Sequence, residues 1–270
     1  MPTWEARVSR GTAPADRVDA ELRYAFAAPL VREAALWIDL GCGTGVPAGA
    51  ALAGRPLAGR VILVDASPEA LGEAGREVGG EVAAAVQADL SSAEGAAAVR
   101  TAVAGAGIAG PVLVTCFDVL HQLADFTALV DLLLALGDDG ATVVLSVPDD
   151  AAGALDDPHR ASAWSAGAAE ELRRLLPAGA ISLVQVPVRA AVIVPAAGGE
   201  SAPLGSVTVA ADRAPSHHLL AFGPEAGRLV PASLARAADL DAERADARRR
   251  ESDLAYLEAR LAEAEAPAAG

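Results

Sequence analysis

The sequence contains no lysine, and all 21 of its basic residues are arginine. Without a lysine amine, Schiff-base chemistry and catalysis by a lysine nucleophile are excluded. The arginines are outnumbered by 36 Asp and Glu residues, which gives a net charge of −15 at pH 7. Proteins bind nucleic acids and anionic membranes through Lys/Arg patches, so we do not expect an extended contact of this chain with either.

Cysteine, aromatic residues and long apolar runs are scarce as well. Cys42 and Cys116 are too few for a zinc framework, and the four histidines form no metal-binding pattern, so we expect no metal. Aromatic residues make up 3% of the chain, which disfavours a stacking platform for single-stranded nucleic acid. No apolar run reaches the roughly 18 residues of a spanning helix, and the first residues do not resemble a signal peptide. We therefore expect a cytoplasmic protein without a membrane span.

Apolar residues are abundant, at 53% of a 270-residue chain, which is enough to bury a substantial core. In the first half, short β-branched runs alternate with Ala- and Leu-rich stretches of helical spacing. The expected strands are 36–40, 61–65, 82–87, 112–116 and 142–147, and the expected helices are 16–33, 46–53, 68–78, 93–104 and 126–136. This alternation predicts an α/β fold, with a mainly parallel sheet covered by helices on both faces.

The pattern changes after Pro148. A helix is expected at 166–176, and apolar runs at 181–188, 191–195, 206–210 and 217–222 are expected to finish the same sheet with antiparallel strands. From 233 to 265 the sequence predicts a charged helix with a partial heptad seam, which either packs on its own domain or forms a coiled coil in a homodimer. We thus expect a main domain over 1–228 and a helical extension over 229–270.

The most informative segment, 36–45, reads Leu-Trp-Ile-Asp-Leu-Gly-Cys-Gly-Thr-Gly. It predicts a strand that runs into a turn containing Gly41, Gly43 and Gly45. The dinucleotide-binding pattern G-x-G-x-x-G fits poorly, because valine stands where its third glycine belongs. Glycines let a ligand approach the backbone where a Cβ would collide with it. Asp39, at the end of the strand, adds negative charge that suits a cationic ligand group.

Two further carboxylates lie at strand ends. Asp65 ends the second expected strand, where a carboxylate can accept hydrogen bonds from both ribose hydroxyls of a nucleoside. Asp89 follows the third strand and, taken alone, is a candidate N-cap or turn acid before the helix that starts at Ala93. Asp65 indicates a nucleoside-containing cofactor without deciding which one.

The motif Asp39-x-Gly-x-Gly-x-Gly45 resembles the first motif of class I S-adenosylmethionine-dependent methyltransferases, and Asp65 matches their second. The resemblance implies a Rossmann-like, seven-stranded, mainly parallel sheet and S-adenosylmethionine as cofactor. In this family an Asp placed like Asp89 commonly hydrogen-bonds the adenine amine. The implied cofactor-binding residues are Asp39, Gly41, Cys42, Gly43, Gly45, Asp65, Ala66, Ala88, Asp89, Leu90 and Phe117.

The segment 111–123 resembles the fourth motif of the same family, which passes beneath the cofactor and leads to the substrate. His121 is the first candidate for a general base, because an unperturbed imidazole titrates near physiological pH; Asp118 is the second. A lone histidine at a helix start is more often structural. His159 and the pair His217-His218 are candidates for lining a substrate pocket, with surface or packing roles as the alternative.

Segments 21–30 and 146–176 resemble bacterial methyltransferases associated with glycan and cell-surface polysaccharide assembly. The resemblance implies methyl transfer to an O or N atom of a small molecule or a sugar or glycan intermediate. This chain departs from that group at His121-Gln122, where an acid and a histidine are expected, and at Asp149, where asparagine is expected. Two alternatives stay open: a catalytically silent S-adenosylmethionine-binding scaffold, and an NAD-dependent oxidoreductase.

Overall fold

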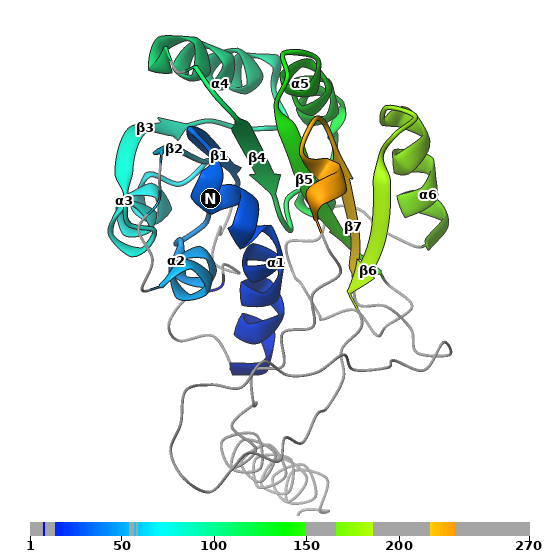
Figure 1. Cartoon of the computed structure of the whole chain (residues 1–270), viewed down its shortest axis with the longest axis horizontal. Coiled ribbons are helices and arrows are strands. Elements are labelled where there is room, and N and C mark those ends of the chain that lie inside the picture. The colour runs from blue at the N-terminus through cyan, green and yellow to red at the C-terminus, as the bar shows by residue number, and fades with distance from the viewer. Residues whose placement is uncertain are drawn as a thin grey trace, which may run out of the picture.

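The structure, a computed structural model, describes residues 8, 14–53, 57, 59–107, 109–149, 166–185 and 217–229. These residues form a seven-stranded sheet between two layers of helices (Figure 1). The strands are β1 (Leu36–Leu40), β2 (Arg60–Asp65), β3 (Glu81–Gln87), β4 (Val112–Cys116), β5 (Thr142–Pro148), β6 (Ile181–Gln185) and β7 (His217–Phe222). The helices are α1 (Pro14–Glu33), α2 (Val46–Leu52), α3 (Pro68–Glu77), α4 (Ala93–Ala106), α5 (Thr127–Asp138) and α6 (Ala166–Leu175), with 3₁₀ turns η1 (Leu120–Gln122) and η3 (Ala226–Arg228).

The strand order is β3-β2-β1-β4-β5-β7-β6. Strands β1 to β5 pair in parallel, whereas β7 runs antiparallel to both β5 and β6. The order reverses direction between β1 and β4, which are neighbours in the sheet but far apart in sequence. In open α/β sheets, ligands bind at such a switch point, beyond the carboxyl ends of the strands. A ligand site is therefore expected among the residues that follow β1, β2 and β4.

The alternation of side chains along each strand builds two separate cores. Ile38 of β1 is fully buried on the face that α4, α5 and α6 cover. Its neighbour Trp37 points to the opposite face, which α1, α2 and α3 cover. Both faces of the central strands are therefore apolar, as in other parallel sheets with helices on both sides. Every polar side chain placed on the α1 face near a strand end thus needs an explanation.

Local sequence signals set the starts of two helices. Ser67 caps α3 by accepting a hydrogen bond from the Ala70 backbone N–H at 3.2 Å, and Pro68 occupies the first turn. Ser92 caps α4 in the same way through the Gly95 N–H at 3.0 Å. Ser67 follows the end of β2 closely, and Ser92 follows the short turn after β3, so both helices start near the carboxyl edge of the sheet.

The predicted seven-stranded, mainly parallel sheet is confirmed, and the antiparallel ending is confirmed at β7. Most of the described helices and strands begin or end one or two residues away from the predicted positions. Helix α4, for example, continues to Ala106 instead of ending at 104. The expected strands at 191–195 and 206–210, His159, and the charged helix at 233–265 lie outside the described residues. The domain boundary at 228 and the coiled coil stay predictions.

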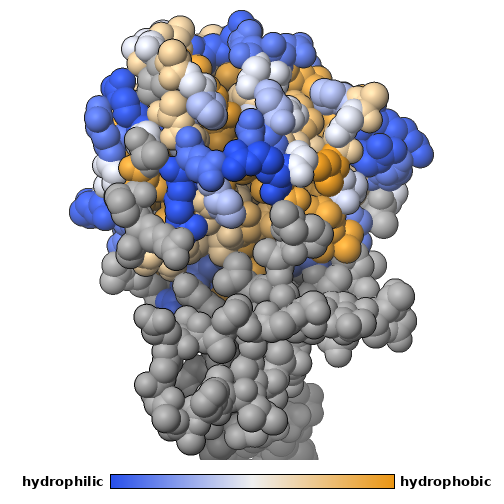
Figure 2. All heavy atoms as spheres, in the orientation of Figure 1, coloured by the Kyte–Doolittle hydropathy of each residue, from blue (hydrophilic) through white to orange (hydrophobic). Residues whose placement is uncertain are grey.

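The surface of the described part is mixed in character. Figure 2 shows hydrophilic residues on the outward side of α6, whose inward side chains Ala169 and Leu172 are buried. Within the described residues, we find no helix with the length and hydropathy needed to cross a membrane. The same residues contain no cluster of three or more His, Cys, Asp or Glu side chains placed to hold a metal ion.

Candidate functional site

The turn after β1 has the backbone geometry that only glycine adopts easily. Gly41, Gly43 and Gly45 have φ angles of 75°, 54° and 73°, in the left-handed region. A Cβ on Gly41 would lie 2.3 Å from Cγ2 of Val119, and a Cβ on Gly45 would lie 2.7 Å from the Cα of Ala74 in α3. The glycines therefore let the turn pack between the residues that follow β4 and helix α3.

Asp65, at the end of β2, holds this turn in place. Its Oδ2 accepts a hydrogen bond from the Gly43 N–H at 3.0 Å, and its Oδ1 accepts one from the Ser67 N–H at 2.9 Å. The Gly41 and Cys42 N–H groups both donate to the carbonyl of Val64, at 2.8 and 3.0 Å. A single buried carboxylate thus ties the glycine turn to the start of α3.

Asp39 is fully buried and enclosed by side chains. Its carboxylate accepts hydrogen bonds from the hydroxyls of Thr115 at 2.6 Å and Tyr24 at 3.1 Å, while the Trp37 indole donates to Thr115 at 2.8 Å. Burial raises the pKa of Asp39 to about 7, although both hydroxyls work in the opposite direction. The predicted electrostatic contact of Asp39 with a cofactor ammonium group stays a prediction.

Because of the raised pKa of Asp39, the free energy of unfolding is expected to depend on pH. The folded protein holds the Asp39 proton up to about pH 7, whereas the unfolded chain releases it near pH 4, so this group costs stability progressively as pH rises through that window. The side chain in the variant Asp39→Asn cannot ionise, so the free energy of unfolding of the variant relative to the wild type should rise by about 3 kcal/mol when the pH is raised from 5 to 8. Denaturant unfolding at the two pH values measures this difference, with exposed Asp131→Asn as the control. An equal effect at both pH values would contradict the prediction.

The remaining predicted cofactor residues cluster along the same edge of the sheet. The Ala88 N–H donates to the Asp65 carbonyl at 3.1 Å, and Ala88, Leu90 and Phe117 are all buried. The Ala66 carbonyl accepts a hydrogen bond from the side chain of Gln87 at 3.3 Å. The structure thus brings the ends of β1, β2, β3 and β4 together, as their order predicts.

Asp89 is exposed, and its carboxylate accepts two hydrogen bonds from Ser91, from the N–H at 2.9 Å and from the hydroxyl at 2.6 Å. Ser92 and not Asp89 caps α4, so the N-cap alternative for Asp89 is wrong, and the contacts of Asp89 with Ser91 fit the turn-acid alternative. The contact of Asp89 with adenine stays a prediction. Cys42 and Cys116 are both buried free thiols, so no disulfide lies beside the glycine turn.

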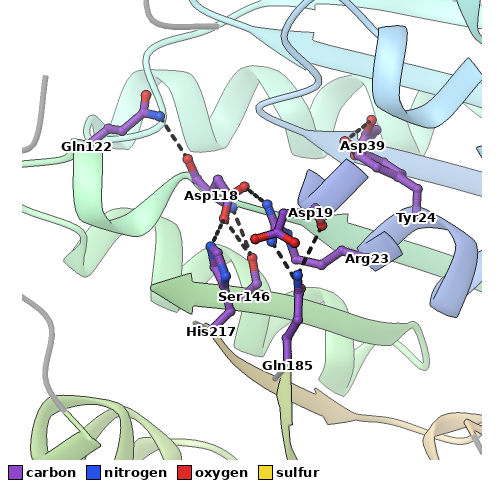
Figure 3. Close-up of polar contacts among 9 residues, drawn as sticks. All are labelled: Asp19, Arg23, Tyr24, Asp39, Asp118, Gln122, Ser146, Gln185 and His217. Atoms are coloured by element: carbon purple, nitrogen blue, oxygen red, sulfur yellow. Dashed lines mark hydrogen bonds and ion pairs between the residues drawn. The ribbon is translucent and has the colours of Figure 1, made fainter. Parts of the chain in front are cut away.

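A second group of polar side chains surrounds Asp118, just after β4 (Figure 3). Asp118 has a positive φ of 57°, and its carboxylate forms an ion pair with Arg23 of α1. Arg23 is 3% exposed and also donates to the Gln185 side chain at 3.1 Å. The Ser146 hydroxyl lies 3.2 Å from Asp118 Oδ1, and His217 Nε2 lies 3.4 Å from the same oxygen.

Neighbouring charges, more than burial, set the pKa of Asp118. Burial by itself would raise the pKa of Asp118, but Arg23, His217 and His121 outweigh it and hold that pKa well below its usual range. Asp118 therefore stays ionised at any working pH, which makes it a stable anion and a weak base. His121 lies in η1 and is buried, close enough to act on Asp118 electrostatically.

Sequence reasoning missed several residues of the site: Arg23, Tyr24, Thr115, Val119, Ser146 and Gln185. Arg23 and Tyr24 lie within an Ala-rich helix, where they look like surface residues until packing is known. Thr115, Ser146 and Gln185 are polar residues inside apolar strands. The sequence did contain one signal for them, namely a polar residue within an otherwise apolar strand. Such residues are few where both faces of a strand are buried, because each buried polar group needs a hydrogen-bond partner.

The described residues offer chemistry that suits S-adenosylmethionine. The glycine turn leaves backbone without Cβ atoms beside the carboxylate of Asp65, and apolar Ala88 and Leu90 follow at the next strand end. Such an edge offers an anion for ribose hydroxyls and apolar surface for a base. We propose that Gly41, Gly43, Asp65 and Ala88 would hold the cofactor, whose chemistry is the donation of a sulfonium methyl group.

Comparisons with known proteins bear on the family and the fold of the chain. Residues 15–183 match a family model described as a methyltransferase domain. The sequence matches no curated protein. The small RNA methyltransferase HEN1 has a similar structure, with a TM-score of 0.50 and 14% identity over 85% of this chain. This chain spans only 28% of the length of the HEN1 chain, so the likeness concerns the fold.

Two further structures are similar at lower scores. The plantazolicin methyltransferase BamL, in complex with a triazolic desmethylPZN analog and SAH, has a TM-score of 0.43 and 15% identity, covering 66% of this chain and 68% of its own. The magnesium protoporphyrin IX methyltransferase of Synechocystis, with bound SAH, has a TM-score of 0.39 and 16% identity, covering 62% and 77%. Because the family model spans more than half of the chain, the chain belongs to the methyltransferase domain family.

Proposed function

We propose that this methyltransferase transfers the methyl group of S-adenosylmethionine to an O or N atom of a small molecule or of a sugar or glycan intermediate. The observation that carries the proposal is the position of the two polar groups. Asp65 and the glycine turn lie at the ends of β1 and β2, and the cluster around Asp118 lies next to them, at the end of β4. A donor at the first group would present its methyl toward the second.

The acceptor is inferred from the second group. Asp118 and His217, whose side chains are 28% and 12% exposed, bring a carboxylate and an imidazole to one edge of the sheet, which suits an acceptor with a hydrogen-bonding group. The net charge of −15 disfavours an RNA or DNA acceptor. Direct displacement needs no nucleophilic side chain, because much of the rate comes from holding donor and acceptor in line.

Calorimetric titration of the purified protein with S-adenosylmethionine, S-adenosylhomocysteine and NAD tests the first half of the proposal. We expect micromolar binding of both sulfur compounds and none of NAD. Labelled S-adenosylmethionine, offered with monosaccharides, nucleotide sugars, phenols and primary amines, then tests transfer. Binding without any transfer would favour a catalytically silent scaffold. Binding of NAD alone would contradict the proposal.

A further inference from the structure

Asp39 in β1 has no exposed surface, although it lies close to the cofactor edge. Its neighbours come from two other elements: Thr115 from β4, the adjacent parallel strand, and Tyr24 from α1 (Figure 3). Thr115 is also fully buried, and Tyr24 is 5% exposed. The glycine turn starts at Gly41, shortly after Asp39 in the chain. The carboxyl group of Asp39 thus lies one layer inside the edge where the cofactor is proposed to bind.

The hydrogen-bond partners of Asp39 are hydroxyl groups. Thr115 Oγ1 lies 2.6 Å from Oδ1 of Asp39, and the Tyr24 hydroxyl lies 3.1 Å from Oδ2. The Trp37 indole, which can only donate, binds Thr115 Oγ1 at 2.8 Å, so Thr115 directs its own O–H to Asp39. A tyrosine hydroxyl can donate to an ionised carboxylate or accept from a protonated one. The contacts therefore serve Asp39 in either protonation state.

The charged surroundings of Asp39 favour its neutral form. Within the described part of the chain, Asp39 forms no ion pair with an arginine or a histidine, and the sequence has no lysine. The titratable groups that interact with Asp39 or with Tyr24 are themselves acids: Asp65 of β2, Cys42 of the glycine turn, Cys116 of β4 and Asp118. Burial in such surroundings raises the pKa of Asp39 to about 7. Below that pH, Asp39 is largely protonated in the free protein.

Asp118 has the opposite arrangement. Its partner is the buried cation Arg23, the residue before Tyr24 in α1, and Arg23 holds the pKa of Asp118 well below its usual range. Asp118 is thus an anion with or without a ligand. Of these two acids, only Asp39 can change its charge near pH 7. A cation brought to the glycine turn stabilises a nearby carboxylate, so we expect it to act on Asp39.

We propose that Asp39 is the proton-releasing group of the cofactor site, neutral in the free protein and ionised when the ammonium group of the cofactor binds at the glycine turn. This inference rests on the proposed function. Asp39 acts through its charge and not by contact, because Tyr24 and Thr115 enclose it. Its O–H bond breaks, the bonding pair stays on the carboxylate oxygen, and the proton passes to solvent. Both hydroxyls then donate to the carboxylate.

Calorimetry measures the released proton when S-adenosylhomocysteine, which carries the ammonium group, is titrated into the full chain in buffers of different ionisation enthalpy. If the bound cation returns the pKa of Asp39 from about 7 to about 4, roughly 0.7 proton should leave at pH 6.5 and less than about 0.1 at pH 8.5. For the same reason, the dissociation constant should fall about tenfold between pH 6 and pH 8.

Two variants assign the proton to Asp39. Imidazole groups titrate in the same range, so the difference between the wild type and Asp39→Asn, and not the total, measures Asp39. Asp39→Asn should release about 0.5 proton less than the wild type, or fewer still, at pH 6.5. Its dissociation constant should change no more than about twofold between pH 6 and pH 8. Asp131→Asn, the same change at an exposed acid of α5, should match the wild type in both measurements.

Tyr24→Phe tests the same inference in a protein that keeps the carboxyl group. The ring of Tyr24 packs edge-to-face on Phe117, with centroids 5.0 Å apart, and phenylalanine preserves that contact. The lost hydroxyl favours the ionised form of Asp39, so its removal should shift proton release to higher pH. The variant should then release more protons than the wild type at pH 7.5. A purely structural role of Tyr24 would change the affinity and leave the pH of proton release where it was.

A ligand without the ammonium group identifies the cause. 5′-Methylthioadenosine keeps the adenosine and the thioether but lacks the amino-acid end, so its binding should show no proton release that depends on Asp39. Equal release with 5′-methylthioadenosine and S-adenosylhomocysteine would mean that the adenosine end causes it, and would overturn the inference.

The failure of this inference and that of the proposed function give different results. Wild-type protein that binds no S-adenosylhomocysteine at any pH would overturn the proposed function, and this inference with it. Protein that binds it, but releases the same number of protons with and without the Asp39→Asn change, would overturn the inference alone. Tyr24→Phe with a wild-type pH of release would do the same.

Discussion

Replacing Asp65 with alanine is expected to weaken the binding of S-adenosylmethionine by about 100-fold or more. The proposed role of Asp65 is to accept the ribose hydroxyls, and hydrogen bonds to a charged group are worth about 1.5–3 kcal/mol each. Asp65 also accepts the Gly43 and Ser67 N–H groups, so its loss removes the contact that orders the glycine turn. Two such losses correspond to about two decades in the dissociation constant.

Calorimetric titration measures this change against two other variants. Asp65→Asn keeps the shape and one acceptor oxygen, so its affinity should lie between those of the wild type and the alanine variant. Asp131→Ala removes an exposed acid of α5 and should bind like the wild type. An Asp65→Ala protein that is folded and binds within threefold of the wild type would show that the cofactor contacts lie elsewhere.

Replacing Arg23 with methionine is expected to lower the free energy of unfolding by about 3–5 kcal/mol. Arg23 is the buried cation that faces Asp118, and methionine leaves that carboxylate without its partner in a partly enclosed place. The Gln185 side chain loses a donor at the same time. Removing one partner of a buried pair is costly because the other charge stays behind, whereas the intact pair itself adds little.

The pH dependence identifies the cause. The pKa of Asp118 is lowered in the folded protein, so the pair contributes stability above the pKa of the unfolded chain and loses it as pH falls through the folded value. The deficit of Arg23→Met should therefore be complete at pH 7 and shrink below pH 4. Denaturant unfolding at several pH values measures it. Arg173→Met, which breaks an exposed pair with Glu170 in α6, should cost only a small fraction of that deficit, because solvent screens an exposed pair.

A double variant decides between charge and packing. Asp118→Asn should recover part of the loss in the Arg23→Met background, because it removes the unpaired carboxylate. If Arg23→Met costs no more than Arg173→Met, the Arg23–Asp118 pair contributes no more than an exposed pair, and the anchoring of Asp118 from α1 is wrong.

Sequence by itself determined the features that depend on neighbours along the chain. The alternation of apolar runs with helical stretches was sufficient for the order of elements, because each period follows from local backbone geometry. The turn at Gly41–Gly45 could be recognised because left-handed backbone and close packing admit few other residues. Asp65 followed as well, since the carboxyl ends of neighbouring parallel strands meet at one edge of the sheet.

Only the tertiary structure decided which polar residues meet at the far side of that edge. Arg23, Asp118 and His217 are almost 200 residues apart in sequence at the extremes, and their contacts depend on the register of β7 between β5 and β6 and on the packing of α1. A shift of one residue in that register would turn His217 to the other face and bring His218 to Asp118. Register and helix packing are set by the whole core, so no local pattern around either histidine could distinguish the two.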